Sequence, residues 1–210
     1  MATVVCPPEK MVIIRGISWE TYNRLIAEHG EKGGTRFTYD EGALEIMVLS
    51  SRHERHNRVL AALVEAIAEE MGIDLERLGS TTFRRADLQK GFEPDSCFYI
   101  ENAKHVRGKD EIDLNADPPP DLLIEVDITS ESLDRFSIFA AVGVPEVWHC
   151  NGERVSFFRL DGLEYVETTD SPTFPQLRSE VATRFLAESR ELTSTAWLRN
   201  VREWVRSNRA

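Results

Sequence analysis

One stretch of the sequence, Asp121 to Ile128, places acidic residues inside a run of branched apolar residues, and this combination restricts the possible folds most strongly. Branched apolar residues favour a β-strand, in which successive side chains point to opposite faces. Leu123, Glu125 and Asp127 therefore share one face, and the other face is wholly apolar. A buried carboxylate without a partner costs several kcal/mol. The strand therefore requires a cation or hydrogen-bond donors beside Glu125, or an exposed position at the edge of a sheet.

The segments around this strand predict a series of helices and strands. Apolar residues recur at intervals of three and four from 57 to 71, and Gly72 follows, which predicts a long helix. The other predicted elements are helices after Ser18 and over 132–142, a hairpin of 36–40 and 43–48, strands over 81–87, 93–100, 121–128, 146–150 and 154–160, and a C-terminal helix. This order indicates an α/β fold with one mixed β-sheet flanked by helices.

The length and the absence of linker-like segments predict a single domain over 1–210. Its expected parts are an N-terminal appendage with a helix and a hairpin over 1–50, a core over 51–160 and a C-terminal helical extension over 161–210. The C-terminal helix carries an apolar stripe that includes Trp197, Val201 and Trp204. This stripe predicts either a dimer surface or a helix packed on its own domain.

The acidic balance limits the classes of partner. The chain of 210 residues has 25 Lys and Arg against 36 Asp and Glu, which gives a formal net charge of -11. No global positive field is therefore present to hold nucleic acid or an anionic membrane. Any phosphate-binding site must be local, and overall affinity for DNA is expected to be weak.

The start of the chain and its cysteines predict its compartment. The first residues lack the basic start of a signal peptide, and no apolar run reaches the ~18 residues of a membrane span. We therefore expect a cytoplasmic protein without membrane contact. Cys6, Cys97 and Cys150 show no CxxC spacing and are expected to be buried thiols.

A second acid is a candidate partner of Glu125. Asp95 follows Glu93 and Pro94 at the start of a predicted strand, thirty residues before Glu125. If the two strands are neighbours, both carboxylates meet as hard oxygen ligands for Mg²⁺, which would polarise a phosphate and activate a water. Alternatively, Asp95 caps a turn, and the acids of the second strand face solvent or pair with Arg84 and Arg85.

Five segments in a fixed order point to a known family. They are Gly42-Ala-Leu-Glu-Ile-Met47, Ser51-Arg-His-Glu54, Glu93-Pro-Asp95, Pro119-Pro-Asp-Leu-Leu-Ile-Glu-Val126 and Gly143-Val-Pro-Glu-Val-Trp148. From Tyr39 to Gly152 the chain resembles the Uma-two group of restriction-endonuclease-like proteins, within the PD-(D/E)XK nuclease superfamily. The resemblance implies a metal-dependent nuclease core in which Asp95 and Glu125 match the two metal-binding acids. It also implies a homodimer as the usual assembly.

The sequence departs from the superfamily pattern at one position. A lysine usually follows the second acid by two residues and positions the attacking water, but Asp127 stands there. In many relatives the lysine lies on the next helix, where Arg135 is the matching residue. Arginine stays charged and donates hydrogen bonds but does not act as a base. Glu45 matches a further acidic position of the family, although a salt bridge within the hairpin would explain it equally well.

Basic residues gather at the start of the long helix. His53, which matches a histidine of the family, lies between Arg52 and Arg55, and His56 and Arg58 follow. A helix N-terminus favours phosphate through its free N–H groups and dipole, so arginines there predict a local contact with DNA. The alternative is a solvated start of the helix with a capping histidine.

Two hypotheses follow. In the first, Mg²⁺ or Mn²⁺ held by Asp95, Glu125 and the carbonyl of Val126 activates water to hydrolyse DNA phosphodiester bonds, with Arg135, Asp127 or Glu45 completing the site. In the second, the chain is a catalytically inactive, dimeric binding or regulatory protein that retains the nuclease fold. The acidic balance and the missing lysine motivate the second hypothesis.

Overall fold

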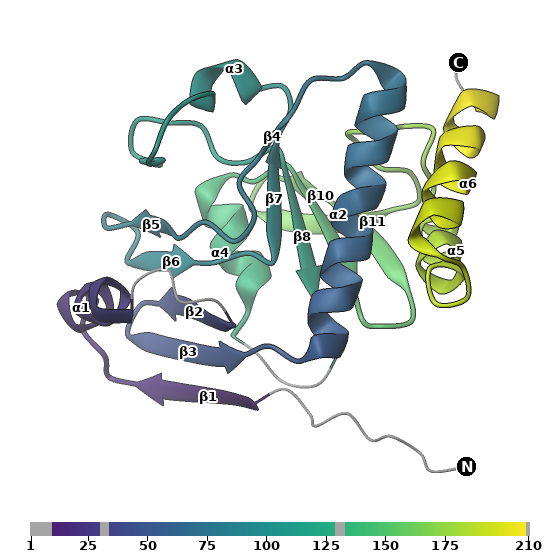
Figure 1. Cartoon of the computed structure of the whole chain (residues 1–210). Helices are drawn as coiled ribbons and strands as arrows, with labels where there is room; N and C mark the ends of the chain where they lie inside the picture. The colour runs from purple at the N-terminus through teal and green to yellow at the C-terminus, as the bar shows by residue number, and fades with distance from the viewer. Residues whose placement is uncertain (1–9, 30–33, 129–132, 209–210) are drawn as a thin grey trace, which may run out of the picture.

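The computed structural model describes residues 10–29, 34–128 and 133–208 and contains two β-sheets (Figure 1). The first sheet is mixed, because β8 and β9 run parallel and its other neighbouring strands run antiparallel. Its strands in order are β11 (Glu164–Thr168), β10 (Val155–Asp161), β9 (Glu146–Cys150), β8 (Leu122–Val126), β7 (Ser96–Tyr99) and β4 (Glu76–Arg77). The predicted mixed sheet is confirmed.

The second sheet is antiparallel and was not predicted as a separate sheet. Its strands in order are β1 (Lys10–Arg15), β3 (Ala43–Val48), β2 (Thr35–Asp40), β6 (Lys90–Phe92) and β5 (Phe83–Arg85). The hairpin of β2 and β3 was predicted, and it pairs with β1 on one side and β6 on the other. β5 lies within the strand predicted over 81–87, whereas β6, with three residues, is too short to show the alternation on which strand prediction depends.

Helices cover both faces of the first sheet. They are α2 (Ser51–Met71), α3 (Ala103–Val106), α4 (Arg135–Val142), α5 (Ser179–Glu188) and α6 (Ser194–Ser207), whereas α1 (Trp19–His29) packs on the second sheet. Leu122, Ile124 and Val126 pack in one core with α2, whereas Leu123 packs on the opposite face with α4. Figure 1 shows α5 and α6 on the outer side of α2, so the apolar stripe of α6 packs on its own chain.

The long helix begins earlier than predicted. Ser50 caps it, because its hydroxyl accepts a hydrogen bond from the backbone N–H of His53 at 3.1 Å. Gly72 ends it as predicted, in the left-handed conformation that glycine adopts without strain. The residues from 51 to 56 are mostly polar and show no apolar period, so the sequence pattern missed two turns. The basic segment therefore lies on the helix, and its side chains point in several directions.

Two smaller predictions concern thiols and membranes. Cys97 and Cys150 are buried and free, as predicted, and burial raises the pKa of Cys97 to about 12. Cys6 lies outside the described residues. Ser132, the first residue of the helix predicted over 132–142, also lies outside them, and the helix itself begins at Arg135. Among the helices in the described part of the chain, none combines the length and apolar character needed to cross a membrane.

Tyr22 of α1 and Tyr39 of β2 stack on each other, and their hydroxyl groups are expected to differ in their contribution to stability. The hydroxyl of Tyr39 donates to the carbonyl of Ile17 at 2.9 Å, whereas that of Tyr22 is buried without a partner among the described residues. Tyr39→Phe is expected to lower the free energy of unfolding by about 1 kcal/mol, and Tyr22→Phe to leave it unchanged or raise it. Urea unfolding measures both, and equal losses would contradict this difference.

Candidate functional site

The two acids predicted to bind metal lie on neighbouring strands. β7 and β8 are antiparallel with Ser96 opposite Ile124, so Asp95, just before β7, falls opposite Glu125. One carboxylate oxygen of Asp95, Oδ2, accepts a hydrogen bond from the backbone N–H of Val126 at 2.8 Å. Both acids are 2% exposed. The structure therefore brings together the two residues that the sequence pattern paired.

Arg135 connects Glu125 to the second sheet. It is the first residue of α4, and Asp134 before it caps the helix. Its Nη1 donates to Glu125 Oε2 at 2.8 Å, and its Nη2 donates to Glu45 Oε1 at 2.6 Å. The other oxygen of Glu45 accepts from the backbone N–H of Leu133 at 2.7 Å. Glu45 therefore pairs with α4, and the expected alternative of a salt bridge within the hairpin is wrong.

The alternative partners of the β8 acids are also excluded. Arg84 donates to Asn23 and Arg85 binds Asp87, so neither contacts the buried acids. The acids do not lie at an edge either, because β8 is an inner strand of its sheet. Arg135 supplies the cation that a buried strand carboxylate requires.

α2 holds Asp95 through two side chains. His53 Nε2 lies 2.8 Å from Asp95 Oδ1, and both side chains are buried. One turn later, the Asn57 side chain donates to the carbonyl of Asp95 at 3.0 Å and accepts from the hydroxyl of Ser96 at 2.7 Å. Sequence analysis did not select Asn57. With the helix starting at 51, Asn57 lies one turn after His53 and shares the buried face of α2 with His53 and Leu60. This position would have indicated Asn57 as a site residue.

Asp127 and His149 form the exposed side of the site. His149 lies directly opposite Glu125 across the parallel pair of β8 and β9. Its Nε2 is 3.5 Å from Asp127 Oδ2, and the side chains of His149 and Asp127 are 26% and 30% exposed. The other acids are almost fully buried, so solvent reaches the site from here. His149 was not predicted as a site residue, because only the pairing of β8 with β9 brings it beside Glu125.

The charges of the site do not balance. Four acids, namely Glu45, Asp95, Glu125 and Asp127, surround one permanent cation, Arg135. Burial raises the pKa of Glu125 to about 8, since the lowering effect of Arg135 is offset by the charges of Asp95 and Asp127. Burial opposes ionisation of Asp127, but the hydrogen bond with His149 and the charge of Arg135 lower its pKa overall. A further cation would relieve this excess.

The donor atoms fit a hydrated divalent cation. Glu125 Oε1 is buried and has no hydrogen-bond partner among the described residues, which is rare for a buried acceptor. Mg²⁺ commonly binds one or two carboxylates and keeps several waters. In the described part of the chain, no cluster of three or more His, Cys, Asp or Glu is arranged to hold a metal. Asp95 and Glu125 are therefore the two candidate carboxylate ligands, and waters would complete the coordination of an ion there.

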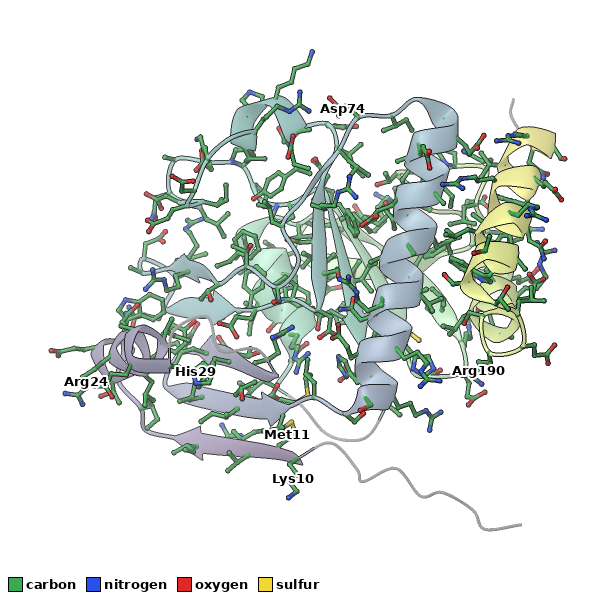
Figure 2. All side chains as sticks on the ribbon, in the orientation of Figure 1. Lys10, Met11, Arg24, His29, Asp74 and Arg190 are labelled. Atoms are coloured by element: carbon green, nitrogen blue, oxygen red, sulfur yellow. The ribbon has the colours of Figure 1, made fainter. Side chains whose placement is uncertain are left out.

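The basic residues of α2 separate into two groups. Arg52 Nη2 lies 3.3 Å from Glu153 Oε1, and His56 Nε2 lies 3.1 Å from Arg190 Nη2. Figure 2 labels Arg190, which extends from the end of α5 toward the first turns of α2. Arg55 and Arg58 point elsewhere and line a cleft. His53 and His56 are held by different partners, namely Asp95 and Arg190.

Comparisons with known proteins bear on the fold and the family of the chain. A crystal structure of a putative nuclease belonging to DUF820, from Anabaena variabilis ATCC 29413, matches with a TM-score of 0.53 and 15% identity, covering 81% of this chain and 99% of that chain. At this identity the likeness shows the fold alone, and it confirms the expected restriction-endonuclease-like core. No curated protein matches the chain. The family model Uma2, described as "Putative restriction endonuclease", matches residues 19–190, and the chain belongs to this family.

Proposed function

We propose that the chain is a metal-dependent endonuclease that hydrolyses phosphodiester bonds in DNA. Families with the restriction-endonuclease-like fold generally use divalent metal ions. The observation that carries the proposal is the placement of Asp95 and Glu125 side by side, with Glu125 Oε1 buried and without a partner among the described residues. Paired hard oxygen ligands next to an excess of negative charge are suited to a divalent cation.

The proposed ligands are Asp95, Glu125 and the carbonyl of Val126, with Mg²⁺ or Mn²⁺ as the ion. When bound, the ion would polarise a phosphate oxygen and lower the pKa of a water. His53 and the N–H of Val126 fix the carboxylate of Asp95. Arg135 fixes one oxygen of Glu125 and leaves the other free. Hydrogen-bonded ligands of this kind are held in one orientation, which strengthens metal binding.

Arg135 and Asp127 have different proposed roles in the reaction. The Nε of Arg135 is buried and has no partner among the described residues, so it can donate to a phosphate oxygen. Arginine does not accept a proton, so it does not replace lysine as a base. Asp127, which is paired with His149 beside Glu125 and reached by solvent, is placed to take the proton of the attacking water.

The proposed DNA contact is local. Arg52, Arg55 and Arg58 were expected to make it, but Arg52 is paired with Glu153. Arg55 and Arg58 have no ion-pair partner among the described residues and carry this proposal. The homodimer implied by the family resemblance stays a prediction.

A second candidate is a catalytically inactive binding or regulatory protein with the same fold. The observation that favours it is the bridge that Arg135 makes between Glu45 and Glu125. A guanidinium in this position already supplies a cation to both acids, as in a purely structural ion-pair network. This candidate predicts neither cleavage nor metal binding at Asp95 and Glu125.

DNA cleavage distinguishes the two candidates. Supercoiled plasmid and single-stranded DNA are incubated with the full chain and Mg²⁺ or Mn²⁺, with and without EDTA. Cleavage is expected to require the ion and to fall by more than ~100-fold in Asp95→Ala and Glu125→Gln, since losing even an outer-shell partner of a metal costs 10–100-fold. Glu203→Gln on α6 is the matched control and should cleave like the wild type. Divalent-independent cleavage, or none in any variant, would overturn the proposal.

A further inference from the structure

A cleft with a volume of about 600 Å³ lies between the start of α2 and the second sheet. Three arginines contribute to its lining: Arg36 from β2, and Arg55 and Arg58 from α2. Hydroxyl groups of Ser50, Ser51 and Ser80 are also available along its wall. The lining thus comes from separate segments of the chain and carries three permanent cations.

These arginines lack the acidic partners that most other arginines in the described part of the chain have. Arg77 and Arg107, for example, bind acidic side chains. In the part of the chain that the structure describes, no carboxylate lies within ion-pair distance of Arg36, Arg55 or Arg58, although Glu54 also lines the cleft. In a chain with a net charge of -11, three neighbouring arginines without a described acidic partner are unexpected.

Arg36 gives the most specific indication of a ligand. Its Nη1 donates to the carbonyl of Thr35 at 3.3 Å, and its Nε is buried with no hydrogen-bond partner among the described residues. A buried donor on a charged group is costly when it remains unpaired. Guanidinium groups bind phosphate oxygens through two parallel N–H bonds, so a phosphate would satisfy this donor.

The cleft adjoins the acidic site. Arg36 lies directly opposite Met47 in the β2–β3 pair, so the two side chains share one face of the sheet. Met47 Sδ lies 3.7 Å from Arg135 Nη2, and Glu45 lies on the same face two residues before Met47. On the other side, Glu54 of the cleft directly follows His53, which binds Asp95. The arginines of the cleft therefore lie next to the segments that hold Arg135 and Asp95.

We infer that this cleft binds a backbone phosphate of the DNA strand whose neighbouring phosphodiester lies at Asp95 and Glu125; the inference rests on the proposed function. Arg36, Arg55 and Arg58 contact phosphate oxygens and no base edges. Contacts of this kind fix the register of the strand without reading its sequence. The cleft therefore positions the substrate and contributes to affinity rather than to the chemical step.

The test measures DNA binding without cleavage. The affinity of the full chain for a fluorescein-labelled DNA oligonucleotide is measured in EDTA by fluorescence anisotropy at several salt concentrations. Arg36→Gln and Arg58→Gln are each expected to weaken binding about tenfold, and to reduce the slope of log Kobs against log salt by about 1. Arg199→Gln on α6 removes the same charge away from the cleft and should change neither quantity.

The outcomes separate this inference from the proposed function. Arg58 is exposed, so Arg58→Gln is expected to fold normally. Arg36→Lys keeps the positive charge but lacks the planar guanidinium, so it is expected to restore DNA binding only in part. Wild-type affinity and salt slope in both glutamine variants, or no DNA binding by the wild type, would overturn the inference. A third outcome is that the glutamine variants bind DNA more weakly, as expected, but the wild type does not cleave DNA with Mg²⁺ or Mn²⁺. This outcome would support the phosphate-binding cleft and overturn only the proposed function.

Discussion

Arg135→Met is expected to lower the free energy of unfolding by about 3–5 kcal/mol, because it leaves two buried acids without their cation. Arg135 is 6% exposed and bridges Glu45 and Glu125 at 2.6 and 2.8 Å. The control Arg77→Met removes an exposed pair with Glu65 and should cost less than about 1 kcal/mol. Urea unfolding followed by circular dichroism measures both, and a loss in Arg135→Met as small as in the control would contradict this account.

The loss in Arg135→Met is expected to depend on pH. Burial already raises the pKa of Glu125 to about 8, and removing the nearby guanidinium raises it further. A carboxyl with a raised pKa binds more protons in the folded than in the unfolded state. Its stabilising contribution is complete below the unfolded pKa of about 4.3 and is lost as the pH rises through the folded pKa. Below about pH 7 Glu125 is protonated in the folded wild type and in the folded variant, so the deficit should stay constant there. It should grow above pH 8, where Glu125 ionises in the wild type but stays protonated in Arg135→Met.

Arg135→Lys separates charge from geometry. A lysine ammonium keeps the positive charge but does not present a planar pair of donors to Glu45 and Glu125 together. Stability is therefore expected to lie between those of the wild type and Arg135→Met. A lysine variant as unstable as the methionine variant would show that the two-acid bridge, and not the charge, sustains this part of the fold.

The strand that carries Glu125 was predictable because its pattern is local. Alternation assigns Leu123 and Glu125 to one face and Ile124 to the other, and the structure places them so. The approach of Asp95 to Glu125 was also expected, from spacing together with the family resemblance. The faces of the strand followed from residues within that strand alone. The pairing of Asp95 with Glu125 followed from the order of the motifs along the chain.

The remaining parts of the site depend on pairings that a single sequence does not reveal. His149 reaches the site because β9 lies beside β8 in one register, and a shift by one residue would turn its side chain away. Asn57 was missed because polar residues from 51 to 56 hid the first two turns of α2. The second sheet was not predicted as a separate sheet because the pairing of the β2–β3 hairpin with β1 and β6 joins segments that are far apart in the sequence.

Asp95→Asn and Glu125→Gln are each expected to weaken Mn²⁺ binding more than ~100-fold, since each removes one of two carboxylate ligands. Both variants keep the shape of the side chain, so the fold should be retained. His53 and Val126 fix Asp95, and Arg135 fixes Glu125, so the carboxylates are already oriented for binding. Each substitution should therefore abolish binding of the same Mn²⁺ ion.

The affinity of the wild type for Mn²⁺ should rise with pH. Metal binding requires the ionised carboxylate, and burial keeps Glu125 largely protonated below its pKa of about 8. Between pH 6 and 8 the ion therefore competes with one proton, and the affinity should increase by up to about tenfold per pH unit. Above pH 8 this dependence should become flat.

Calorimetric titration of Mn²⁺ into the full chain tests the central claim most directly, because it measures metal binding at Asp95 and Glu125 independently of DNA. The titration compares the wild type with Asp95→Asn, Glu125→Gln and the control Glu203→Gln on α6. The account predicts one Mn²⁺ site in the wild type and in the control, and its loss in the other two variants. Equal binding by all four proteins, or no binding by the wild type, would contradict it.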